Sequence, residues 1–135
     1  MKRDLDLCRD ILLKVEGAPP GGLPDCGSYR LNDEVQNERA IDFGDHSEAE
    51  VLYNIRLLFE AGFLGQDTSI FVHGGIACRS MTWAGHDYLD AVRDPEIWSK
   101  TKSGAAKVGG ATFEMVKAIA IGYAKHKASE LGIPL

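Results

Sequence analysis

One amphipathic helix followed directly by two short strand-forming runs is the feature that most constrains how this chain can fold. Ser47 and Glu50 match a capping box, in which the serine hydroxyl and the glutamate carboxylate each accept a backbone N–H at the helix start. The apolar residues that follow recur at helical spacing, and Gly62 supplies the left-handed exit that often ends a helix. Residues 68–72 and 76–83 are rich in strand-forming side chains, and the glycines between them suit a tight turn. The sequence therefore predicts a helix that leads into an antiparallel hairpin.

Further helices are expected on both sides of this unit. Apolar residues at helical spacing predict one helix over residues 3–16 and another over residues 84–93. Pro95 suits the first turn of a next helix, and Thr112 suits the cap of the last one. By contrast, residues 17–46 contain three prolines and five glycines, which predicts a long loop with one or two short strands.

The order of these elements predicts the fold class. A helix, a variable segment, an amphipathic helix and a two-stranded hairpin follow one another in winged-helix domains. We therefore expect an α+β fold, a winged-helix-like domain whose hairpin is the wing, with additional C-terminal helices. A chain of 135 residues has the usual size of one domain, with the winged-helix-like core at residues 1–83 and the helical extension at residues 84–135. Trp83 and Trp98 are expected to pack in the core.

Composition excludes several classes of protein. The three cysteines are an odd number without CxxC spacing, which predicts free thiols rather than a disulfide framework or a zinc site. The four histidines are scattered, so we expect no bound metal and no cofactor. No run of 18 apolar residues occurs, and the first residues are charged. Both features argue against a membrane span and a signal peptide, and we expect a cytoplasmic protein.

The charge of the chain is unevenly distributed. The formal net charge is −5, which runs against nucleic-acid binding, where lysine and arginine must displace counterions from phosphates. Residues 17–50 contain eight acidic residues and two arginines, a net charge of −6. Residues 100–135 contain six lysines and two glutamates, a net charge of +4. The sequence is therefore polarised, with an acidic segment and a basic C-terminal third.

Nine side chains are candidates for contacts with DNA or with a partner protein. In a DNA complex an asparagine can pair with adenine and an arginine with guanine, but Glu50 and Glu60 on the same helix would repel phosphates. A solvated or protein-binding face is therefore an equally good interpretation of this helix. The lysines lie in a mobile basic stretch with glycines, which suits a phosphate backbone or an acidic protein surface, or is a solvated run. The candidates are Tyr53, Asn54, Arg56 and Leu57 on the helix, His73 and Arg79 on the hairpin, and Lys100, Lys102 and Lys107 in the basic stretch.

Catalytic chemistry has little support in the sequence. His86 stands beside Asp87 and near Asp90, and a carboxylate can orient an imidazole for acid–base work. A histidine with neighbouring aspartates more often caps or flanks the start of a helix without a catalytic role. The phosphate-binding patterns GxxxxGK[ST] and GxGxxG are both absent. We therefore expect no catalytic residue.

The chain also resembles a family of short bacterial and prophage proteins of unknown function. The similarity rests on the starting run MKRDLDLCRDILLKVE, the helix EAEVLYNIRLLFEAGFL and the run MTWAGHDYLDAVRDPEIWSKTK. The third run is the most specific, and the three together cover most of the chain. The resemblance implies a winged-helix-like fold and a prophage-linked context, but no activity.

Two functions of different classes follow from these observations. The first is a prophage-associated transcriptional regulator of winged-helix type that binds duplex DNA, for which a homodimer would supply enough contacts. The alternative is a protein-interaction module, an acidic prophage factor that inhibits or adapts a host protein complex. Because the same fold serves both uses, the fold does not decide between them. We expect DNA binding to weaken steeply with added salt, whereas a protein partner would be recovered by affinity capture.

Overall fold

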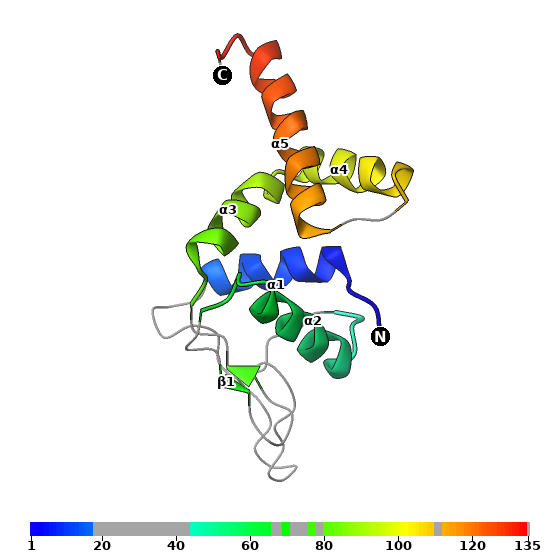
Figure 1. Ribbon diagram of the computed structural model, residues 1–135, viewed down its shortest axis with the longest axis vertical. Helices are drawn as coiled ribbons and strands as arrows, with labels where there is room; N and C mark the ends of the chain where they lie inside the picture. Colours follow the sequence, from blue (N-terminus) through cyan, green and yellow to red (C-terminus); the bar gives the residue numbers. More distant parts are fainter. Residues whose placement is uncertain (18–43, 66–68, 71–75, 78–79, 110–111, 135) are drawn as a thin grey trace. The chain divides into compact units, whose positions relative to one another are not determined.

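The structure, a computed structural model, is almost entirely helical (Figure 1). It describes residues 1–17, 44–65, 69–70, 76–77, 80–109 and 112–134. The contacts divide the chain into two compact units, Met1–His86 and Asp87–Leu135, and the division falls inside a helix. The helices of the described residues are α1 (Leu5–Gly17), α2 (Glu48–Glu60), α3 (Trp83–Val92), α4 (Pro95–Lys107) and α5 (Phe113–Glu130).

The predicted α+β winged-helix fold is wrong. The two strands expected to form the wing shrink in the described residues to β1 (Ser69–Ile70) and β2 (Ile76–Ala77), which pair antiparallel with Ser69 opposite Ala77. A pair of two-residue strands is far shorter than the strands of a typical sheet. The described residues therefore form a helical protein with one sheet of two very short antiparallel strands, and not a helical core with a wing.

In the first unit, α1 packs against α2. The helix α1 forms because apolar residues recur at helical spacing and because Asp4 caps its start, accepting the N–H of Leu7 at 3.0 Å. At the start of α2, the Ser47 hydroxyl accepts the N–H of Glu50 at 3.2 Å, which confirms the predicted capping serine. The buried apolar residues of the two helices are Leu7, Cys8, Ile11, Leu12 and Val15 of α1 and Val51, Ile55 and Leu58 of α2.

The chain leaves α2 through a short antiparallel ladder. Gly62 has a φ of 80°, the left-handed conformation predicted for the exit of this helix. The next residue, Phe63, accepts the N–H of Thr82 at 3.0 Å, and Leu64 forms an antiparallel bridge with Met81. The end of α2 and the start of α3 are therefore held side by side by backbone hydrogen bonds.

In the second unit, α4 packs against α5. Gly104 allows this approach, since a Cβ placed on it would lie 3.3 Å from Ile119 Cγ2. Pro95 lies in the first turn of α4 and the Thr112 hydroxyl accepts the N–H of Met115 at 3.1 Å, so both predicted helix starts are confirmed. The buried residues of this unit are Tyr88, Leu89, Val92, Trp98, Thr101, Ala105, Val116 and Ala120.

None of the helices in the described part of the chain combines the length and the apolar character needed to cross a membrane.

Candidate functional site

The structure separates the four candidate residues of α2. Arg56 is exposed, and Tyr53 and Leu57 are half-buried, so these three side chains lie on the accessible side of the helix. The prediction that Asn54 also faces outward is wrong, because this residue is only 1% exposed. Asn54 is therefore placed to stabilise the fold rather than to contact a partner.

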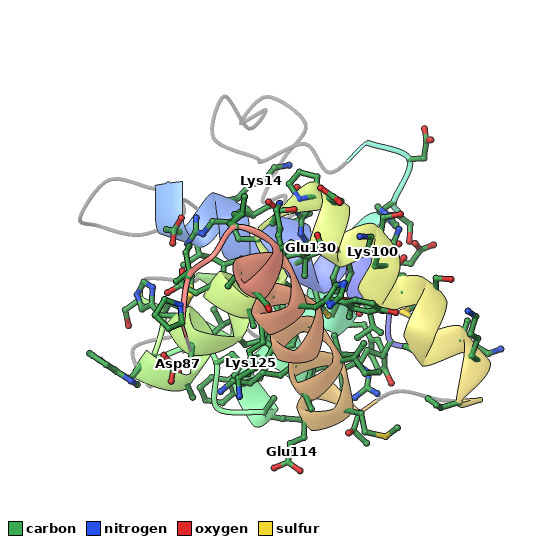
Figure 2. The ribbon with its side chains drawn as sticks, turned by 90° about the horizontal axis from the view of Figure 1, so that it is seen from above. Lys14, Asp87, Lys100, Glu114, Lys125 and Glu130 are labelled. Carbon is green, nitrogen blue, oxygen red and sulfur yellow. The ribbon has the colours of Figure 1, made fainter. Side chains whose placement is uncertain are left out.

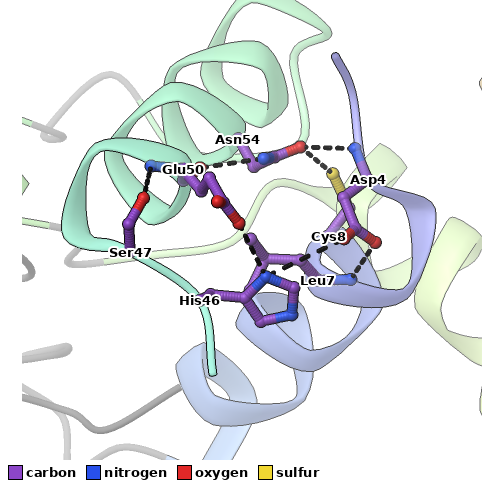
Figure 3. Close-up of polar contacts among 7 residues, drawn as sticks. All are labelled: Asp4, Leu7, Cys8, His46, Ser47, Glu50 and Asn54. Atoms are coloured by element: carbon purple, nitrogen blue, oxygen red, sulfur yellow. Dashed lines mark hydrogen bonds and ion pairs between the residues drawn. The ribbon is translucent and has the colours of Figure 1, made fainter. Parts of the chain in front are cut away.

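Asn54 joins α2 to the start of α1 (Figure 3). Its Oδ1 accepts the backbone N–H of Asp4 at 2.8 Å and the thiol of Cys8 at 3.5 Å. Its Nδ2 donates to the carbonyl oxygen of Glu50 at 2.8 Å. A single amide thus satisfies polar groups of both helices, which is what a buried polar side chain requires.

His46 lies at the edge of the same cluster. Its Nδ1 lies 3.0 Å from a carboxylate oxygen of Glu50 and 3.9 Å from one of Asp4 (Figure 3). The hydrogen bond to Glu50 raises the pKa of His46 above its ordinary value, and the charges of the nearby carboxylates act in the same direction. Among the described residues, no three histidine, cysteine, aspartate or glutamate side chains gather in a way that could hold a metal ion.

The Cys8 thiol is buried, and burial raises its pKa to about 12. Because the thiolate is the reactive form, a thiol with a raised pKa reacts slowly at pH 8. We expect iodoacetamide to leave Cys8 unmodified in native buffer at pH 8 and to modify it fully in denaturant, as measured by peptide mass spectrometry. Rapid modification of Cys8 in the native protein would contradict this burial.

The three candidate lysines lie on a regular helix rather than in a mobile stretch. α4 continues through Gly104 as far as Lys107, and all three lysines are exposed. Lys100 forms an ion pair with Glu96 at 3.3 Å, and the Lys102 ammonium lies 5.9 Å from the centre of the Trp98 ring. The prediction of a mobile stretch is therefore wrong.

The remaining candidates are the two hairpin residues and the trio His86, Asp87 and Asp90. His73 and Arg79 lie outside the described residues. His86 and Asp87 are exposed on α3, and Asp90 accepts a hydrogen bond from Arg93 at 2.8 Å.

The surface residue that stands out is Trp83, which sequence reasoning assigned to the core. Trp83 is 83% exposed at the first position of α3, whereas Trp98 is 5% exposed and is confirmed as a core residue. Tryptophan is highly buried on average, so a nearly free indole on a folded helix needs an explanation.

The backbone that carries Trp83 is held on both sides. The Thr82 hydroxyl accepts the N–H of Gly85 at 3.1 Å and donates to the carbonyl oxygen of Gly62. Gly85 is buried against Phe63, so closely that a Cβ on it would collide with the Phe63 carbonyl group. Trp83 is therefore presented from a fixed helix start, with the exposed Ala84 beside it.

The exposure of Trp83 could have been predicted from helical geometry. The buried residues of α3 are Gly85, Tyr88, Leu89 and Val92, which share one side of the helix. At 100° a residue, Trp83 lies about 170° from the middle of that side. The periodicity of α3 thus places the indole opposite the core.

The comparisons with known proteins identify the family. Residues 2–112 match the family described as "Hypothetical protein (DUF2513)". The chain belongs to the DUF2513 family. A relative from Haemophilus influenzae, called an uncharacterized protein, is 32% identical over 107 residues, which cover 76% of this chain and 77% of the relative. No solved structure matches the chain. The predicted resemblance to a family without an assigned function is thus confirmed, and Trp83 lies within the residues that match DUF2513 while α5 lies after them.

Proposed function

We propose that this protein is a non-enzymatic protein-binding module that uses Trp83 as its anchor. The observation that carries the proposal is the 83% exposure of this indole at a fixed helix start. The partner is a folded protein with an apolar pocket that encloses the indole ring.

The chemistry of tryptophan supports this use. Tryptophan is among the residues most enriched at the energetic centres of protein interfaces, because it buries a large area with few rotatable bonds. The Thr82 hydrogen bonds and the close packing of Gly85 fix the backbone on which Trp83 stands. A rigid support reduces the ordering entropy that binding must overcome.

Charge favours a protein over DNA as the partner. The net charge is −5, and phosphate binding needs cations that are available for counterion release. Two basic side chains of the second unit face carboxylates instead, since Lys100 pairs with Glu96 and Lys127 pairs with Asp94 at 3.4 Å. Arg56 and its half-buried neighbours on α2 form only a small surface for contacts with DNA bases and phosphates.

Affinity capture with matched variants tests the proposal. Tagged wild-type protein, Trp83→Ala and Leu131→Ala are compared in lysate of the cells that naturally produce the protein. Leu131 is the control because it is another large apolar residue, 69% exposed, at the end of α5. Loss of a buried tryptophan anchor weakens binding by about 2 kcal/mol or more, which is at least about 30-fold.

We expect a discrete protein that wild type and Leu131→Ala retain and that Trp83→Ala loses, while all three proteins unfold at the same temperature. Equal recovery by Trp83→Ala would remove Trp83 from the interface. The alternative function, DNA binding, has its own readout: fluorescence anisotropy of labelled duplex DNA at about 50 and about 200 mM salt. Tight binding that weakens steeply with salt would favour the DNA-binding regulator instead.

A further inference from the structure

The helix α5 carries an exposed face that the packing of its own unit leaves uncovered. Glu114, Ala118, Ile121 and Lys125 are all exposed, and at 100° a residue they lie within about 60° of one another around the helix. We call these four residues the outer face of α5. Figure 2 shows Glu114 and Lys125 projecting from α5 away from α4. The face has opposite charges at its two ends, about 16 Å apart, and a small residue beside an apolar one between them.

Gly122 stands beside the outer face and has no packing role among the described residues. A Cβ built on Gly122 meets nothing within 4 Å, whereas one built on Gly104 lies 3.3 Å from Ile119. Glycine inside a helix is less favourable than alanine, so its presence there needs another reason. Met115, 40% exposed, lies on the same flank of the helix, about 20° from Gly122 around the axis. A surface gap and a long flexible side chain on one flank suit the close approach of another helix.

We propose that two copies of this chain associate through the outer faces of α5, with the two helices antiparallel. In this arrangement Glu114 of each copy lies opposite Lys125 of the other copy. Ala118 of each copy lies opposite Ile121 of the other, so that a small side chain meets a larger one. The contact is isologous, as in most homodimers, and each pairing occurs twice.

The order of the side chains along α5 indicates that the partner of the outer face is a second copy of this chain. From its N-terminal end, the outer face presents an acidic, a small, an apolar and a basic residue in turn. An antiparallel copy presents the same residues in reverse order, so that acid meets base and the small residue meets the apolar one. On the flank, Met115 of one copy lies within about 3 Å, along the axis, of Gly122 of the other. A parallel pair would instead place Glu114 beside Glu114 and Lys125 beside Lys125, which like-charge repulsion disfavours.

The proposed contact is small. Stable interfaces bury about 800 Å² on each partner, and one pair of helices of this length falls at or below that size. The two ion pairs are exposed and add little, especially at high salt. We therefore expect a reversible dimer that forms at concentrations on the order of tens of micromolar.

Charge reversal tests this pairing in the full chain. Sedimentation equilibrium is measured for wild type, Glu114→Lys, Lys125→Glu and an equimolar mixture of the two variants. Each variant alone places like charges opposite each other twice, so we expect its dimerisation to weaken about tenfold or more. The mixture pairs opposite charges at both ends, and we expect a heterodimer within about threefold of wild-type affinity.

The double variant Glu114→Lys/Lys125→Glu again places opposite charges at both ends when two identical copies associate. It gives a second readout, and its helix content is followed by circular dichroism. Wild-type protein that stays monomeric up to about 200 µM would overturn the proposal. So would a mixture or a double variant that associates no better than the single variants. The association does not use the Trp83 surface, so Trp83→Ala is expected to dimerise like wild type, which keeps the tests of the two proposals separate.

Discussion

Replacing Gly85 by alanine is expected to lower the free energy of unfolding by about 3 kcal/mol, because the added methyl group has no space. Its Cβ would collide with the Phe63 carbonyl oxygen and lie 2.6 Å from Met81 Cγ. The Phe63 carbonyl group cannot move freely, since it accepts the N–H of Thr82 in the ladder that joins α2 to α3. Urea denaturation followed by circular dichroism at 222 nm measures the change.

Gly122→Ala is the matched control for this substitution. A Cβ on Gly122 meets nothing within 4 Å, so alanine there should be neutral or stabilise the monomer by about 0.5–1 kcal/mol. The comparison is made in dilute protein, where self-association is negligible. Similar stabilities of Gly85→Ala and wild type would mean that α3 does not begin against Phe63 as described.

Asn54→Ala is expected to destabilise the protein by about 2–3 kcal/mol, the second large effect. The substitution removes the acceptor of the Asp4 N–H and of the Cys8 thiol, and leaves these groups without the partner that the fold provides. It also leaves a cavity, because Asn54 is buried. Chemical denaturation of the variant and of wild type gives the difference.

Arg56→Ala, on the exposed side of the same helix, is the control for Asn54→Ala and should change stability by no more than about 0.5 kcal/mol. If both alanine variants had the same stability as wild type, Asn54 would not join α1 to α2. A stability loss confined to Asn54→Ala supports a structural role for this residue and removes it from the contact surface of α2.

Helix starts and ends were predictable because they depend on local chemistry. Ser47 and Thr112 each cap a helix with a side-chain oxygen, and Gly62 adopts the left-handed exit. These signals need only a few neighbouring residues, which is why the starts of α2, α4 and α5 were anticipated from the sequence.

The errors arose where tertiary contacts override local preference. Strand-forming residues predicted a wing, but strand pairing depends on neighbours, and in the described part of the chain the pairing joins two residues on each side. The glycines near Lys100, Lys102 and Lys107 led to the prediction of a mobile stretch, yet Gly104 lies inside α4 and lets α5 approach this helix. Asn54 was assigned to the outward face of the helix, although at 100° a residue it lies about 40° from Leu58 on the buried side.

The candidate surface could be predicted only in part. Arg56, Tyr53 and Leu57 were correctly placed on the accessible side of α2. Trp83 was missed because an aromatic residue at the end of a strand-forming run is usually a core residue, so its residue type was given more weight than its position on a helix. The geometry of α3 carries the information that corrects this assignment.

Photo-cross-linking beside Trp83 tests the proposed function most directly. Ala84, exposed next to the indole, is replaced by the photoreactive amino acid p-benzoylphenylalanine, and living cells that produce the protein are irradiated. We expect a covalent adduct with one discrete protein. This adduct should be lost when the same chain also carries Trp83→Ala, and it should not form when the cross-linker is placed at Leu131. An absence of protein adducts at position 84, or an adduct that persists without Trp83, would contradict the assignment of Trp83 as the anchor of a protein-binding surface.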